Sequence, residues 1–225
     1  MGGVFYVLMA LSGGLATFAR RGILVSGDAS TTATNIMAHQ SMYLLAFAGD
    51  LLVVAAYLAV TAFFYRMLKP VSRSVSLIAA FFSLTACAIQ GFALTFQLAP
   101  LTLLGGAPYL GVFRVEQLQA LAYMFLKLYS QAYGVAIAFF AFYGLLTGYL
   151  AFKSTFLPRT LGGLMMLAGL TWLTFLSPLF AAKYFSYILP FAVGEGLFAL
   201  WLLVKGVDAE RWKQRTAAAR IVEPF

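Results

Sequence analysis

Runs of apolar residues long enough to cross a lipid bilayer occupy most of this sequence. A membrane-spanning helix needs about 20 such residues, because it rises about 1.5 Å per residue through a hydrocarbon layer roughly 30 Å thick. Six candidate runs lie at residues 4–19, 42–65, 75–104, 131–152, 161–181 and 187–204. Hydrophobic residues make up 63% of the chain, against roughly 45–50% in soluble domains. The sequence therefore predicts an all-α, multi-pass membrane bundle of about six helices over residues 1–205, with a basic cytoplasmic tail at 206–225.

The segments around these runs carry signals for where helices begin and end. Residues 115–152 are helix-like for longer than one bilayer, and we divide them into an amphipathic outer part, 116–129, and a spanning part that starts at 131. Pro178 is expected to kink the end of the fifth run. Between the first and second runs, Asp28 or Ser30 is expected to cap a short helix that leads to His39.

The distribution of Lys and Arg predicts the orientation of the chain, because cytoplasmic segments of membrane proteins are enriched in these residues. If the N-terminus is cytoplasmic, ten bases face the cytoplasm: Arg66, Lys69, Arg73, Lys153, Arg159, Lys205, Arg211, Lys213, Arg215 and Arg220. Five bases then face the other side: Arg20, Arg21, Arg114, Lys127 and Lys183. Ten against five favours a protein of the inner (cytoplasmic) membrane with both termini in the cytoplasm.

The composition also limits the chemistry of the protein. Its formal net charge of +8 arises mainly at the ends of apolar runs, where anionic lipid headgroups attract bases. We therefore expect membrane lipids, and no nucleic acid, as the anionic partner. Cys87 and His39 are the single residues of their types, so we predict no internal disulfide and no metal site rich in Cys or His. Phosphate-loop, zinc-hydrolase and serine-hydrolase motifs are absent, and we predict no cofactor.

Two acids lie inside the apolar runs. Asp50 and Glu195 each fall eight residues into a run that descends from the same predicted face, which corresponds to a depth of about 12 Å. Acids at such depth are costly, face the interior of a bundle and often mark a function. Both are therefore candidate catalytic residues. In the alternative reading they tie helices together, or pair with Lys127 or Arg20. The remaining acids fall in segments that can reach water: Asp28, Glu116, Asp208, Glu210 and Glu223.

Other polar and aromatic residues suggest what surrounds the acids. Ser76, Ser83, Gln90 and Gln97 recur every seven residues, which places them on one face of a helix. Lys127 and Gln131, four residues apart, also share a face. Aromatic residues make up 16% of the chain, and ring faces stabilise cations. The candidate ligand-binding residues are Gln90, Gln97, Lys127, Gln131, Tyr57, Phe92, Tyr133, Trp172 and Phe191. Hydrogen-bonded glue between helices is the alternative role for the glutamines.

Several short stretches resemble a known family. They are LKPVSRSVSLIAA at 68–80, FLPRTLGG at 156–163, Gly194-Glu195, LWLLVKG at 200–206, and Asp50 after FAG at 47–49. Together they are similar to the bacterial membrane family catalogued as domain of unknown function 4386, over nearly the whole chain. This resemblance implies a six-helix bundle and supplies no activity. The chain departs from the family at Ser130-Gln131, where the resemblance leads us to expect a polar residue that is often histidine.

Three functional hypotheses remain open at this point. In the first, the acids and aromatic rings form an intramembrane pocket for a hydrophobic, lipid- or isoprenoid-like ligand, and a metal-independent cyclase or isomerase acts there by protonating the substrate. In the second, the protein is a proton-coupled small-molecule transporter, although its two halves lack the internal similarity typical of transporters. In the third, the bundle binds a lipid or pigment without catalysis, or serves as a partner subunit or homo-oligomer.

Overall fold

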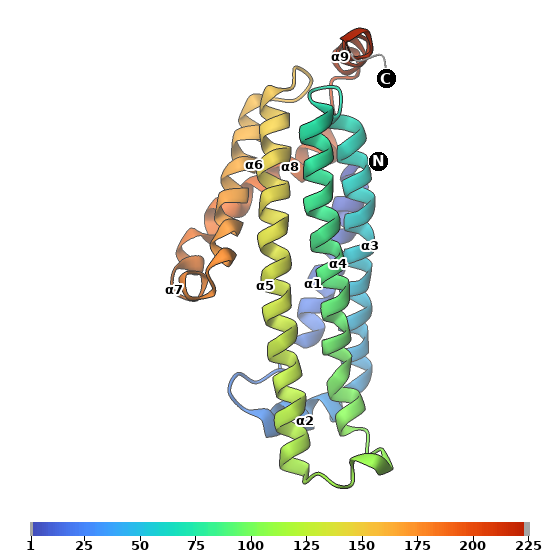
Figure 1. The fold of residues 1–225 in the computed structure, drawn as a ribbon, viewed down its shortest axis with the longest axis vertical. Coiled ribbons are helices and arrows are strands. Elements are labelled where there is room, and N and C mark those ends of the chain that lie inside the picture. The colour runs from blue at the N-terminus through green and yellow to red at the C-terminus, as the bar shows by residue number, and fades with distance from the viewer. Residues whose placement is uncertain (1, 223–225) are drawn as a thin grey trace. The chain divides into compact units, whose positions relative to one another are not determined.

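A computed structural model describes residues 2–222, except for the side chains at 2, 3, 5, 10 and 220–222. Glu223 and the side chain of Arg220, which are among the acids and bases named above, lie outside the described part. The described residues form helices and no strand, which confirms the all-α fold (Figure 1). The long elements are α1 (Gly2–Arg20), α2 (Ala29–Ala38), α3 (Gln40–Leu68), α4 (Arg73–Leu104) and α5 (Val115–Lys153). They are followed by α6 (Arg159–Trp172), α7 (Pro178–Ile188), α8 (Val193–Val204) and α9 (Ala209–Val222), with short 3-10 turns η1 (Pro108–Leu110), η2 (Leu173–Leu176) and η3 (Leu189–Ala192).

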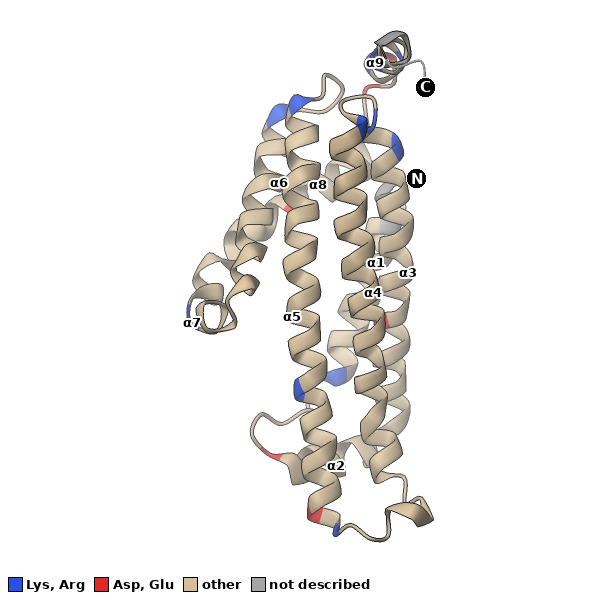
Figure 2. Ribbon diagram, in the orientation of Figure 1, with Lys and Arg blue, Asp and Glu red and all other residues tan. Residues whose placement is uncertain are grey.

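Five segments of the described chain are long and apolar enough to cross a membrane: Gln40–Leu68, Arg73–Leu104, Val115–Lys153, Arg159–Leu176 and Pro178–Val204. The first predicted run is helical as α1 but is not one of these five. In Figure 2 the Lys and Arg positions gather mainly at helix ends, while the middles of the long helices are almost free of charge. The chain is therefore a multi-pass membrane protein.

The two parts into which we divide residues 115–152 belong to one continuous helix, α5, of 39 residues. Nothing interrupts it: the segment has no proline, and Ser130-Gln131 continues the helical hydrogen bonding. A helix of this length extends over about 58 Å, well beyond the roughly 30 Å of hydrocarbon.

The expected boundary between the last two spans is wrong. The chain turns at Ser177, whose hydroxyl accepts a hydrogen bond from the Phe180 N–H, and Pro178 is the first residue of α7. Proline fits that position because the first amide of a helix has no partner within the helix. Glu195 consequently lies seventeen residues after the start of its span at Pro178, rather than eight. The expectation that Glu195 and Asp50 lie at equal depth no longer follows.

The chain divides into two compact units. Unit 1 contains Met1–Val7, Ala56–Cys87 and Gly134–Phe225, and unit 2 contains Leu8–Ala55 and Ala88–Tyr133. The helices α3, α4 and α5 each contribute one part to each unit. Asp50 belongs to unit 2 and Glu195 to unit 1.

Close backbone contacts hold α5, α6 and α8 together in unit 1, where α6 packs against α8 (Figure 1). A Cβ atom on Gly162 would lie 2.3 Å from the Phe152 nitrogen of α5, and one on Gly194 would lie 2.1 Å from the Leu164 oxygen of α6. Only glycine allows such an approach. Gly194 therefore brings the start of α8, and with it Glu195, directly against α6.

Candidate functional site

Asp50 is held by an arginine from another helix of unit 2. Arg20 is the last residue of α1, and its Nη1 forms an ion pair with Asp50 Oδ2. Arg20 Nη2 also lies 3.3 Å from Asp50 Oδ1, so the guanidinium contacts both carboxylate oxygens. Asp50 is buried, whereas the Arg20 side chain keeps 20% of its surface exposed. The alternative reading in which an acid pairs with Arg20 therefore holds for Asp50.

Three more side chains surround this ion pair. Tyr129 of α5 donates from its hydroxyl to Asp50 Oδ2 over 3.3 Å. The Gln97 amide of α4, in the orientation that satisfies both neighbours, donates to Asp50 Oδ2 over 3.2 Å and accepts from Arg20 Nη1 over 3.3 Å. The Tyr43 hydroxyl donates to the backbone oxygen of Gln97. We call Asp50, Arg20, Gln97, Tyr129 and Tyr43 the Asp50 cluster; its charges are matched, and both oxygens of its carboxylate accept hydrogen bonds.

Glu195 has neutral partners. It lies in the first turn of α8 and accepts hydrogen bonds from the Tyr57 hydroxyl, 3.4 Å from Oε1, and from the Trp172 indole, 3.2 Å from Oε2. Trp172 ends α6, and Tyr57 lies on the part of α3 that belongs to unit 1. Within the described residues no Lys, Arg or His lies within ion-pair distance of Glu195. Its charge, when ionised, therefore has no matching cation in that part of the chain.

Aromatic side chains surround these donors. The Tyr57 ring lies 4.1 Å from that of Phe140 and 6.4 Å from that of Tyr143. The Trp172 ring lies 5.4 Å from that of Phe185. Ring faces at these distances make a setting that is apolar and yet attractive to positive charge.

Two further tyrosines are buried close to Glu195. Tyr6 and Tyr143 lie near enough to Glu195 to interact with it electrostatically. The Tyr6 hydroxyl has no hydrogen-bond partner among the described residues. The Tyr143 hydroxyl makes no hydrogen bond of ordinary geometry there, but it lies close to the hydroxyl of Thr147, which is also unpaired. Buried hydroxyls are rarely left unpaired, so each such group calls for an explanation. We call Glu195, Tyr57, Trp172, Tyr6 and Tyr143 the Glu195 cluster, and all of it belongs to unit 1.

The predicted polar stripe on α4 faces inward. Ser76, Ser83, Gln90 and Gln97 are all at least 97% buried. The Ser83 hydroxyl shares a 2.6 Å hydrogen bond with the Thr61 hydroxyl, and the Ser76 hydroxyl donates to the Tyr65 carbonyl over 3.2 Å. These contacts tie helices together, as expected of polar residues between membrane helices.

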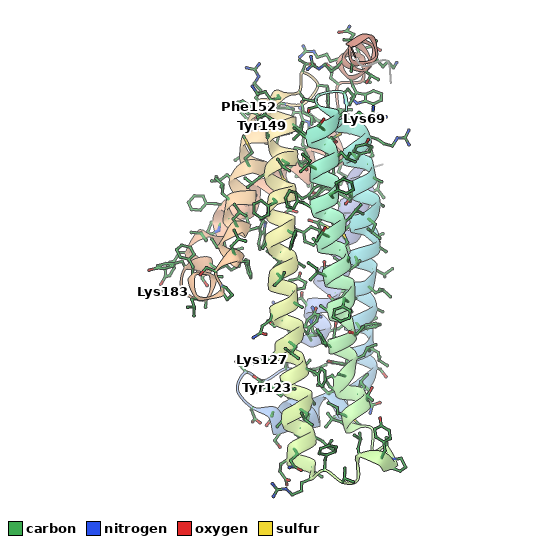
Figure 3. The ribbon with its side chains drawn as sticks, in the orientation of Figure 1. Lys69, Tyr123, Lys127, Tyr149, Phe152 and Lys183 are labelled. Atoms are coloured by element: carbon green, nitrogen blue, oxygen red, sulfur yellow. The ribbon has the colours of Figure 1, made fainter. Side chains whose placement is uncertain are left out.

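Of the predicted site residues, Tyr57 and Trp172 contact Glu195, and Gln97 contacts Asp50. Lys127 and Gln131 are exposed on α5, where the Lys127 ammonium lies 5.2 Å from the centre of the Tyr123 ring (Figure 3). Three predicted aromatic residues are also exposed: Phe92 at 64%, Phe191 at 52% and Tyr133 at 37%.

Sequence reasoning missed the roles of Tyr6, Tyr43, Tyr129 and Tyr143. A hydroxyl that lies inside an apolar run is the signal that could have found them, because it needs a partner there.

A family model described as a domain of unknown function (DUF4386) matches residues 1–206. The chain is also similar to a protein of Archaeoglobus fulgidus described as an uncharacterized protein. The two are 26% identical over 162 residues, which cover 70% of this chain and 82% of that protein. No solved structure matches the chain.

Proposed function

The chain belongs to the DUF4386 family, and we propose that it is a membrane protein whose Glu195 cluster binds a hydrophobic, lipid- or isoprenoid-like ligand through a polar group of that ligand. The observation that carries this proposal is the combination of Glu195, which has no basic partner among the described residues, with the unpaired buried hydroxyl of Tyr6. A ligand hydroxyl, carbonyl or amine would supply the missing hydrogen bonds, and its apolar body would contact the rings.

The same groups support a catalytic version of this function. A protonated Glu195 would donate its proton to one carbon of a ligand double bond, which leaves a carbocation on the other carbon. The Glu195 carboxylate would then remove a proton from a neighbouring carbon, so that the double bond moves and the acid is regenerated. The rings of Tyr57 and Trp172 would stabilise the cation. Asp50 suits this role less well, because Arg20 neutralises it and Gln97 and Tyr129 occupy its oxygens.

A second candidate function, that of a partner subunit, is favoured by the last span. Only 17% of the most apolar window of Pro178–Val204 is buried. Its large apolar side chains include Leu179, which is 87% exposed, and Tyr187, which is 80% exposed. A second membrane protein could cover these side chains, as could lipid.

The first experiment is mass spectrometry of organic extracts from the purified full chain, comparing wild type with Glu195→Gln. Glu116→Gln is the matched control, because Glu116 is an exposed acid at the start of α5. We expect wild type and Glu116→Gln to carry one hydrophobic ligand, and Glu195→Gln to lose it by roughly tenfold or more, as for the loss of a charged hydrogen bond.

The identity of the extracted molecules separates the possible functions. If Glu195→Gln accumulates an isoprenoid that wild type carries only in rearranged form, Glu195 is catalytic. Equal amounts of the same ligand in all three proteins would contradict the proposed site. A co-purifying protein without any bound small molecule would favour the partner-subunit function instead.

A further inference from the structure

A surface pocket in unit 1 lies between the α3–α4 turn and the C-terminal helix α9. Its volume is about 210 Å³, and the residues that line it include Lys69, Ser72, Arg73 and Arg215. Lys69 directly follows α3 (Figure 3), Arg73 is the first residue of α4, and Arg215 lies on α9. Neither the proposed ligand site at Glu195 nor the Asp50 cluster includes any of these residues.

The charge of the pocket has a single sign. Among the described residues that line it, three are basic and none is acidic. The pocket also contains the start of α4, a helix of 32 residues whose dipole favours an anion at this end. Ser72 caps the helix there, and its hydroxyl accepts a hydrogen bond from the Val75 N–H over 3.4 Å. The side chains and the backbone therefore favour the same kind of ligand.

Specific contacts hold α9 in place, and α9 forms the side of the pocket on which Arg215 lies. The Trp212 indole donates to the Met67 carbonyl near the end of α3 over 3.0 Å. At the start of the helix, the Asp208 N–H donates to the Phe156 carbonyl over 3.1 Å. The hydrogen bond of Trp212 thus attaches α9 to the end of α3 one turn before Arg215.

The location of the pocket indicates which class of anion it binds. The pocket lies where the apolar spans of α3 and α4 end, which is the level of lipid headgroups. Guanidinium groups match the geometry of phosphate oxygens, and basic pockets at this level bind anionic headgroups. We propose that the pocket lined by Lys69, Arg73 and Arg215 binds the phosphate group of an anionic phospholipid.

Native mass spectrometry of the full chain in detergent tests this proposal, with phosphatidylglycerol as the probe and diacylglycerol as a lipid without phosphate. We expect one phosphatidylglycerol to bind preferentially, and each of Lys69→Gln and Arg215→Gln to weaken its binding by about fivefold. Lys213→Gln is the matched control, because Lys213 also lies on α9, does not line the pocket, and pairs with Glu210 over 3.6 Å. That variant should bind like wild type.

Several results would overturn the proposal. If Lys213→Gln weakens binding as much as Arg215→Gln, the attraction comes from diffuse surface charge and not from the pocket. Equal binding of phosphatidylglycerol and diacylglycerol would exclude recognition of phosphate. Titration calorimetry with inorganic phosphate alone distinguishes the source: a protein that binds free phosphate and no phosphatidylglycerol would exclude a lipid. The three variants change exposed side chains, and their thermal unfolding should match that of wild type.

Discussion

At the scale of single residues, the two membrane acids differ in their neighbours. Asp50 contacts a guanidinium, an amide and a hydroxyl, all from unit 2. Glu195 contacts a hydroxyl and an indole, both from unit 1. The buried Asp50 carboxylate is neutralised by its partner, whereas the half-buried Glu195 carboxylate has no cation beside it among the described residues.

The Asp50–Arg20 ion pair should therefore be structural. We expect Asp50→Asn to lower the free energy of unfolding by about 3 kcal/mol, because it leaves the Arg20 charge without a partner. The double variant Asp50→Leu/Arg20→Met should recover most of this loss, since it removes both charges. Unfolding of the detergent-solubilised protein in a denaturant series measures both effects. A double variant as unstable as Asp50→Asn would contradict this prediction.

At the scale of elements, the two glycines that flank Glu195 should respond differently to substitution. A Cβ on Gly194 would meet the Leu164 oxygen at 2.1 Å, whereas a Cβ on Gly196 would have no atom within 4 Å. We expect Gly194→Ala to destabilise the protein by about 3 kcal/mol through overpacking. Gly196→Ala should be neutral or stabilising by up to about 1 kcal/mol, because alanine favours a helix.

Thermal or denaturant unfolding of these two variants gives the comparison directly. Similar stabilities would mean that α8 does not pack against α6 at Gly194. The pair Gly162→Ala and Gly163→Ala repeats the test on α6, since only a Cβ on Gly162 would clash.

The cap of α2 should depend on pH. Asp28 accepts hydrogen bonds from the Thr31 hydroxyl over 2.6 Å and from the Thr31 N–H over 2.9 Å, so of the two expected capping residues, Asp28 and Ser30, it is Asp28 that caps α2. These bonds, first of all that from the hydroxyl, lower the pKa of Asp28 below its usual value of about 3.9. The stabilisation by the cap is thus complete above pH about 4 and is lost as the pH falls through the lowered pKa.

A carbon-13 NMR titration of the Asp28 carboxyl checks this prediction. Thr31→Val removes the hydroxyl and keeps the N–H, so it should raise the pKa of Asp28 toward its usual value. An unchanged pKa in Thr31→Val would show that the hydroxyl does not stabilise the ionised carboxylate.

At the scale of the whole molecule, the excess of bases predicts which ends of the spans face the cytoplasm. We expect Lys183 on α7 to lie outside and Lys213 on α9 to lie in the cytoplasm. In a Cys87→Ser background, a membrane-impermeant maleimide applied to spheroplasts should label Lys183→Cys at once and Lys213→Cys only after lysis. The reverse labelling pattern would contradict the predicted topology and show that the chain has the opposite orientation.

The sequence alone determined the properties that depend on neighbouring residues. The length of each apolar run predicted a multi-pass, all-α protein, and the seven-residue spacing of Ser76, Ser83, Gln90 and Gln97 predicted that they share one face of α4, which is buried in the structure. The polar residues before α2 offered Asp28 or Ser30 as its cap, and Asp28 is the residue that caps it. Each of these features follows from the pitch, hydrogen bonding and burial of one helix. They depend on residues that are close together in the sequence, so they can be predicted from it.

Only the tertiary structure decided which partners the acids have. Arg20 and Asp50 are 30 residues apart in the chain, and Tyr57 and Glu195 are 138 apart. Such contacts depend on how each helix is rotated and how closely it approaches the next, and a hydrophobic period does not specify either. For Glu195, the close contact of Gly194 with Leu164 and the turn at Ser177 set the position of α8 against α6. Two acids that are alike in sequence therefore became, through packing, one closed ion-pair network and one carboxylate with neutral donors.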